Sequence, residues 1–240
     1  MRIRGRRRCQ DCGREWSYFD TGRVDCPDCG SMRSVGIGGR RRHTDSPVSL
    51  DLAPHRADLP DDVALADIED VAADLKATLR DYVRQRGFVR GGELRTVDDT
   101  VLAAAELRHA VDVLDRTRDP DDDARLYVLS LLGGADRGER PDPSSVPASM
   151  SDARGLAYAQ VLDDFCSDLG TWLDDNPDAA GRRVRETLQT HIKRVDAVHG
   201  DVAPEEVETL VRVARDLVTY LTDGDETALA TAEDRLDRIE

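Results

Sequence analysis

The chain has 240 residues and a net charge of −15, with 39% hydrophobic and 35% charged residues. This length suffices for one large domain or two small ones with a buried core. No stretch approaches the roughly 20 continuous apolar residues of a membrane span, so no membrane partner is expected. The basic N-terminal segment lacks the apolar stretch of a signal peptide, which predicts a cytoplasmic protein.

The acidic excess has an unusual make-up. Of the 49 acidic residues 37 are Asp, and the only lysines are Lys76 and Lys193. This composition is typical of proteins from salt-in halophiles, where hydrated carboxylates keep a surface soluble and the Debye length falls to ~3 Å. An ordinary acidic protein from a high-GC genome would also be rich in Asp and Arg, and that alternative stays open.

Charge divides the chain into two parts. Residues 1–43 contain eleven arginines and five acidic residues, a net charge of +6, whereas residues 44–240 carry −21. So sharp a change predicts that residues 1–43 form a domain of their own.

Two Cys-x-x-Cys-Gly motifs lie in this first part. They pair Cys9 with Cys12 and Cys26 with Cys29, and thirteen residues separate the pairs. In a chain without an export signal, such pairs indicate a metal site rather than disulfides. Four thiolates suit Zn²⁺ in a closed tetrahedron with no position for water, so we expect one structural Zn²⁺. A rubredoxin-like iron site uses the same ligands and is the alternative.

The residues around the cysteines predict short strands. Residues 16–25 are expected to form a strand, an Asp-Thr-Gly turn and a second strand, because a hairpin would space the two cysteine pairs. Residues 2–8 and 33–37 are expected to supply flanking strands. Gly13 and Gly30 permit the positive φ that each metal-binding turn needs after its second cysteine.

These motifs resemble the zinc-ribbon family, which includes the N-terminal ribbon of the archaeal and eukaryotic general transcription factor B. The resemblance covers about residues 6–37, where the four cysteines match the metal ligands of the family and the two glycines its turn positions. It implies a β ribbon holding one Zn²⁺. The chain as a whole resembles haloarchaeal proteins of unassigned role that carry such a ribbon ahead of a helical region.

The remainder of the chain is predicted to be helical. Residues 44–60 carry three prolines and little periodicity, and they are expected to form a linker. Beyond them, apolar residues recur at three- and four-residue steps. Three helices are expected within residues 61–132, a loop or linker at the Gly/Pro/Ser-rich residues 133–153, and four helices within residues 154–240. The predicted fold class is a small N-terminal β zinc ribbon followed by an all-α helical-bundle body.

Basic and aromatic side chains near the cysteines are candidates for contact with a nucleic acid or a protein partner: Arg6, Arg7, Arg8, Trp16, Arg40, Arg41 and Arg42. Arginines with an interleaved aromatic side chain are typical of phosphate contacts and base stacking. Two other interpretations stay open. Trp16 can belong to the small core of the ribbon, and the arginines can dock on the acidic helical body.

Catalytic signatures are missing from the sequence. We find no nucleophile elbow, phosphate loop or HExxH motif, so no enzyme and no small-molecule substrate are expected. Cys166 lies on an apolar helical face and is predicted to be buried, whereas Asp174 and Asp175 are predicted to lie on a solvated face. We expect a non-enzymatic adaptor whose ribbon contacts a transcription- or translation-related assembly while the acidic helices contact proteins. A direct DNA- or RNA-binding regulator acting through the Arg-rich ribbon is the alternative.

Overall fold

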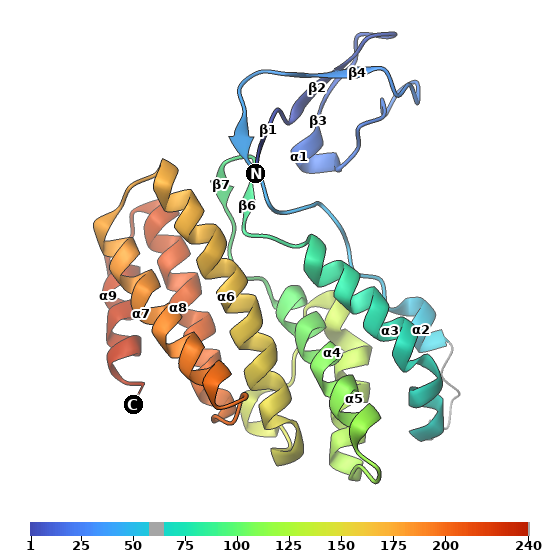
Figure 1. The fold of residues 1–240 in the computed structure, drawn as a ribbon, viewed down its shortest axis with the longest axis vertical. Helices are drawn as coiled ribbons and strands as arrows, with labels where there is room; N and C mark the ends of the chain where they lie inside the picture. Colours follow the sequence, from blue (N-terminus) through green and yellow to red (C-terminus); the bar gives the residue numbers. More distant parts are fainter. Residues whose placement is uncertain (58–64, 240) are drawn as a thin grey trace.

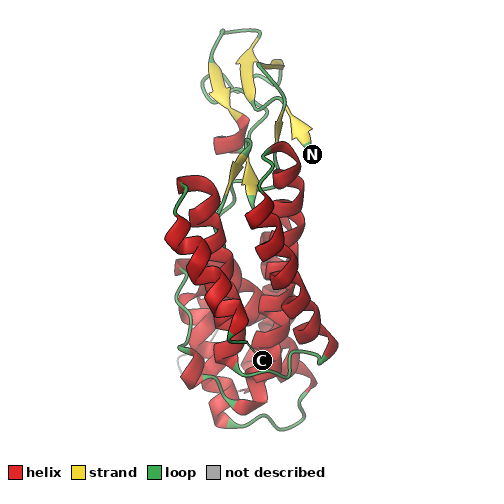
Figure 2. Cartoon of the chain, turned by 90° about the vertical axis from the view of Figure 1, so that its left-hand side faces the viewer, coloured by secondary structure: helices red, strands yellow, loops and turns green. Residues whose placement is uncertain are grey.

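A small β region stands at one end of an elongated helical body (Figures 1 and 2). The computed structural model describes residues 1–57 and 65–239, and side-chain surroundings for all of these except 65–71. The order of a small β region followed by a helical body confirms the predicted fold class. The end of the expected linker and the start of the first helical region lie outside what is described.

A three-stranded antiparallel sheet forms the centre of the β region. Strand β2 (Arg6–Cys9) pairs with both β3 (Glu15–Ser17) and β4 (Ser34–Ile37). Arg7 is opposite Trp16 on one side and Gly36 on the other. A further short pair joins β1 (Arg2–Ile3) to β5 (Arg41–Arg42). The predicted flanking strands are thus confirmed.

The segment after β3 differs from the prediction. Residues Tyr18–Thr21 form one helical turn, α1, and no strand follows it before the second cysteine pair. The Thr21 hydroxyl donates to Ser17 O at 2.8 Å, and Gly22 ends the turn with φ of 65°. The Asp-Thr-Gly sequence therefore ends a helical turn, where glycine tolerates the left-handed conformation, and does not close a hairpin.

Residues 44–57, expected within the linker, pack on the body. Asp45 is fully buried and accepts from Arg90 Nε at 2.8 Å. Leu50 and Leu52 join the main apolar core, and helix α2 (Ala53–Ala57) follows them. A buried carboxylate with a bound guanidinium fixes this segment in place.

The helical body follows the predicted order closely. Its remaining helices are α3 (Leu65–Gln85), α4 (Asp99–Arg116), α5 (Asp122–Gly134), α6 (Ser151–Asp175), α7 (Ala179–Ala197), α8 (Pro204–Asp223) and α9 (Glu226–Asp237). Between α5 and α6 lie three 3₁₀ turns, Ala135–Arg137, Pro143–Ser145 and Ala148–Met150. Asp121 caps α5 by accepting from Ala124 N at 2.6 Å, which satisfies one of the free amides at the helix start.

A two-stranded hairpin, which the sequence did not predict, lies between α3 and α4. Strands β6 (Val89–Arg90) and β7 (Glu93–Leu94) pair around Gly91 and Gly92, whose φ values are 62° and 90°. Two successive positive-φ residues are the signature of the tight turn that fits strand twist.

Both helical regions share one apolar core. A single cluster of buried side chains runs from Leu50 to Leu236 and includes Cys166, as predicted. Helix α6 packs on α4, which belongs to the first region, and on α7 and α8, which belong to the second. None of the described helices combines the length and apolar composition needed to cross a membrane.

Candidate metal centre

Two turns of matching design carry the four cysteines. In the first, Cys9 N donates to Arg14 O at 2.8 Å and Gly13 N donates to Cys9 O at 3.2 Å. In the second, Cys26 N donates to Ser31 O and Gly30 N to Cys26 O, both at 2.9 Å. Gly13 and Gly30 have φ of 79° and 71°, so each turn requires the glycine that follows its second cysteine.

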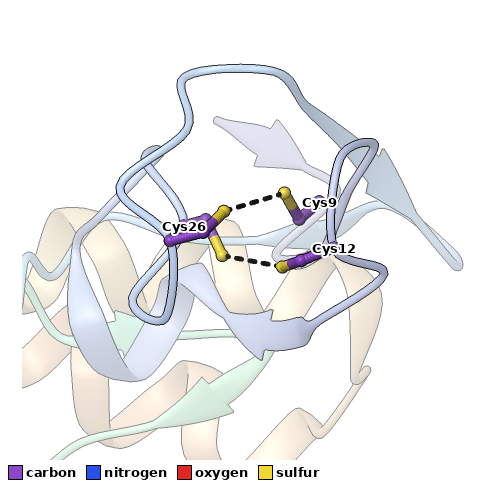
Figure 3. Close-up of side chains that lie close together, drawn as sticks. Cys9, Cys12 and Cys26 are labelled. Atoms are coloured by element: carbon purple, nitrogen blue, oxygen red, sulfur yellow. Dashed lines mark hydrogen bonds between the residues drawn. The ribbon is translucent and has the colours of Figure 1, made fainter.

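The turns bring all four sulfurs together, with every sulfur within 4.8 Å of the others. Cys9 Sγ lies 3.7 Å from Cys29 Sγ, and Cys12 Sγ lies 3.5 Å from Cys26 Sγ. Figure 3 shows the sulfurs of Cys9, Cys12 and Cys26 directed into the space between the two turns. A tetrahedral ion with metal–sulfur bonds of about 2.3 Å sets its sulfurs about 3.8 Å apart. The predicted ligands therefore fit one tetrahedral metal ion.

The pKa values of the thiols reflect how closely the four sulfurs lie. The backbone N–H of Cys12 lowers the pKa of Cys9 to about 7, with help from that of Asp11 and against burial. The backbone N–H of Ser31 lowers the pKa of Cys29, but the sulfurs of Cys12 and Cys26 raise it by more, to about 12. Four thiolates so close together repel one another, and a bound cation removes that cost.

Comparison with known proteins matches nearly the whole chain to one family. A family model described as "Family of unknown function (DUF7117)" matches residues 1–236. The chain belongs to this family. No curated protein and no solved structure matches it. The match spans both the β region of residues 1–43, called the ribbon from here on, and the helical body, so DUF7117 contains both parts.

Trp16 serves the interior of the ribbon in this DUF7117 protein. Its side chain is buried with Cys9 and Cys26, and the three form the small apolar cluster of the β region. The indole N–H donates to Arg23 O at 2.9 Å. The structure therefore places this contact candidate in the ribbon core.

Arg6, Arg7 and Arg8 do not form one patch. Arg8 Nη2 and Arg6 Nη2 donate to the two oxygens of Glu15 on β3, at 2.6 and 2.7 Å. Arg7 points to the other face of β2, and its Nε donates to Ser34 Oγ at 3.0 Å. Alternation along the strand accounts for this division.

Arg41 and Arg42 lie at the junction with the body, apart from the arginines of β2. Arg42 Nε donates to Asp175 Oδ2 at 3.1 Å, and Arg2 pairs with the same carboxylate. Arg41 donates to Gly91 O at 3.4 Å. Arg40 is exposed and makes no hydrogen bond or ion pair among the described residues. The sequence did not reveal Asp175 as a partner, because 173 residues separate it from Arg2.

The ribbon also meets the body through ring contacts. The Phe19 ring of α1 lies against Gly91, where an added Cβ would come within 2.8 Å of it. The ring also meets His43, with centroids 4.9 Å apart. Burial of the ring lowers the pKa of His43. Gly92 N donates to Arg42 O at 2.8 Å, which links the hairpin to the ribbon.

Proposed function

We propose that Cys9, Cys12, Cys26 and Cys29 hold one Zn²⁺, and that the protein is a non-enzymatic adaptor working through its ribbon. The observation that carries the proposal is the closed set of four sulfurs. Zn²⁺ bound by four thiolates keeps no open position for water or substrate, so it stabilises a fold and performs no hydrolysis. Its role is then to hold a recognition surface in shape.

The outer edge of the ribbon offers such a surface. Strand β4 is an edge strand of the three-stranded sheet. Exposed apolar side chains lie on and near this strand, with Met32 70%, Val24 42% and Val35 40% accessible. Exposed large apolar side chains among the described residues are otherwise few, so this grouping favours a protein partner. An extended segment of that partner can add to the free edge of β4.

The arginines of the ribbon favour protein over nucleic acid as the first partner. Seven of the eleven already form ion pairs with carboxylates: Arg2, Arg6, Arg8, Arg14, Arg23, Arg33 and Arg42. A phosphate would have to displace those carboxylates. The expected partner belongs to a transcription- or translation-related assembly, as the resemblance to zinc ribbons implies.

Metal analysis is the first test. We expect one zinc per chain after purification in the absence of added metal, measured by mass spectrometry of the metal content. A protein that carries iron and shows visible thiolate-to-iron absorption would replace zinc with the rubredoxin-like alternative.

The second test uses the full chain as bait in cell extract, at low and at molar KCl. A Met32→Ser, Val35→Ser variant is expected to lose the partner. A Leu126→Ser variant, which changes an exposed apolar side chain of the body, is the matched control and is expected to keep it. Equal recovery with both variants would reject the edge of β4 as the contact surface.

Direct binding of nucleic acid by the ribbon remains the second candidate, because Arg4 and Arg40 are exposed and form no ion pair among the described residues. Titration of labelled DNA and RNA against wild type and an Arg4→Gln, Arg40→Gln variant separates the two roles. Binding that those two substitutions weaken would favour this candidate over the adaptor, and unchanged binding would remove it.

A further inference from the structure

Two cavities lie on either side of Trp172 and the β6–β7 turn. One, of about 600 Å³, opens at the junction between ribbon and body, and the other, of about 690 Å³, lies on the body side. Both are lined by Gly92, Glu93 and Trp172, so they adjoin each other. Their volumes fall in the range of small-ligand sites.

The junction cavity is strongly basic on its ribbon side. Arg2, Arg40, Arg41 and Arg42 line it, opposite Asp174 and Asp175 at the end of α6. Arg2 and Arg42 are held by Asp175. Arg40 forms no ion pair among the described residues, and Arg41 reaches only a carbonyl. Two guanidinium groups are thus available to an anion.

The body-side cavity has a mixed lining. Leu94, Val218 and Leu221 give it an apolar wall beside the half-buried ring of Trp172. The Trp172 indole N–H donates to Gly92 O at 3.0 Å, which fixes the ring at the boundary of the two cavities. Arg95 is exposed here, and its side chain has no partner among the described residues.

Positive charge prevails around this pair of cavities. Seven arginines and four acidic residues line them, in a chain whose net charge is −15. Counting the buried Asp45 that pairs with Arg90 leaves the balance positive. A local field of this sign in an acidic protein selects anions.

We propose that these two cavities form one site for a nucleoside phosphate, with the phosphate on Arg40 and Arg41 and the planar base at Trp172. Guanidinium groups bind phosphate with paired hydrogen bonds, and an indole face stacks on any base. The apolar wall of the second cavity suits the flat face of the base, and Arg95 adds positive charge on that side. The ligand is a free nucleotide or the end of a single strand, which share this chemistry. The site is independent of the proposed adaptor role of the ribbon edge.

The test measures binding to the full chain at low salt with two probes, a fluorescent ADP analogue and a single-stranded RNA of about eight nucleotides. The Arg40→Gln, Arg95→Gln variant is expected to bind about tenfold more weakly than wild type. The Trp172→Leu variant is also expected to bind about tenfold more weakly than wild type, because stacking is lost. The Glu93→Gln variant is expected to bind more tightly, because the substitution removes a negative charge between the cavities that repels the phosphate. Added salt should weaken binding throughout.

Arg118→Gln is the matched control. This exposed arginine lies in the loop between α4 and α5, which Figure 1 shows at the end of the body away from the ribbon, and it forms no ion pair among the described residues. Binding of both probes supports the site and indicates that it recognises the phosphate and the base, which the two probes share. Binding of only one names the source of the ligand. No binding of either probe, or equal weakening by Arg118→Gln, would overturn the proposal. Should Trp172→Leu fail to fold, Trp172→Phe and the exposed arginine pair carry the test.

Discussion

In the ribbon, the buried apolar cluster consists of Cys9, Trp16 and Cys26, two of which are metal-ligand candidates, whereas the body has one cluster that runs from Leu50 to Leu236. So small a cluster cannot offset the conformational entropy lost by some forty residues. A metal ion can, because its binding free energy becomes folding free energy. If the four cysteines hold the proposed ion, the two regions are ordered in different ways, and each is open to a different perturbation.

Removal of the metal should give the largest effect and should separate the two regions. Chelation, or Cys26→Ser with Cys29→Ser, is expected to unfold the ribbon, since metal binding supplies on the order of 10–16 kcal/mol. The helical far-ultraviolet signal should remain, while the amide resonances of residues 1–43 collapse towards random-coil positions. A metal-free protein that keeps those resonances dispersed would show that the ribbon does not depend on the ion.

The second prediction concerns the charge buried in the body. Glu106 and Arg154 are both fully buried, with Arg154 Nε 2.6 Å from Glu106 Oε1, and Tyr158 donates to the same carboxylate at 2.9 Å. Glu106→Gln leaves the guanidinium without its counter-charge, and it should cost on the order of 3–5 kcal/mol.

Guanidinium chloride unfolding of the full chain measures this cost. Glu139→Gln, which breaks an exposed ion pair with Arg137, is the matched control and should cost less than about 1 kcal/mol. Equal costs for the two variants would mean that the pair does not hold α4 to α6. The stability of the body would then rest on its apolar core, with no contribution from this buried ion pair.

Acid should weaken the body through Glu208. Burial raises the pKa of this carboxyl, but Arg140, 2.9 Å away, lowers it by more, so its folded pKa lies below the ordinary value. The pair therefore stabilises the fold above about pH 4.3, and that contribution is lost as pH falls through the folded pKa. Charged hydrogen bonds of this kind contribute about 1.5–3 kcal/mol.

Urea midpoints measured between about pH 3 and about pH 7 check this sign. Wild type should lose more stability below pH ~4.3 than Glu208→Gln does. Parallel acid dependence of the two proteins would show that other carboxylates control the acid sensitivity of the body.

The smallest effect is expected at a helix start. Asp121→Ala removes the cap of α5 and should cost about 1 kcal/mol in thermal or chemical unfolding. Asp119→Ala, on an exposed side chain two residues earlier, is the control and should change stability by only a few tenths. A similar cost at both positions would point to net charge rather than capping.

The local part of the structure could be predicted well. The seven helices predicted for the body lie within a few residues of the two ranges predicted for them, because apolar period, caps and breakers act within one or two turns. The cysteine pairs were equally local, since each turn needs only four residues and a glycine. The hairpin at Gly91 and Gly92 went unpredicted although its turn signal was present, because two-residue strands carry no alternation to detect.

Other features depend on residues far apart in the chain. Asp45 meets Arg90, Thr44 meets Asp168 124 residues later, and Arg2 meets Asp175. The apolar period of a helix shows which of its faces is buried, and it does not show which other helix covers that face. The single core of the two helical regions and the position of Trp172 beside the ribbon arginines follow from such packing.

By itself, then, the sequence determined the two cysteine-bearing turns, the helical content and the charge division, since each is encoded by residue type and short spacing. Only the tertiary structure decided that Trp16 is buried, that Arg6 and Arg8 pair with Glu15 while Arg42 reaches the body, and that two cavities adjoin at Trp172. The reason is physical. A side chain's availability depends on what the rest of the chain brings to it, and that is fixed when the elements pack.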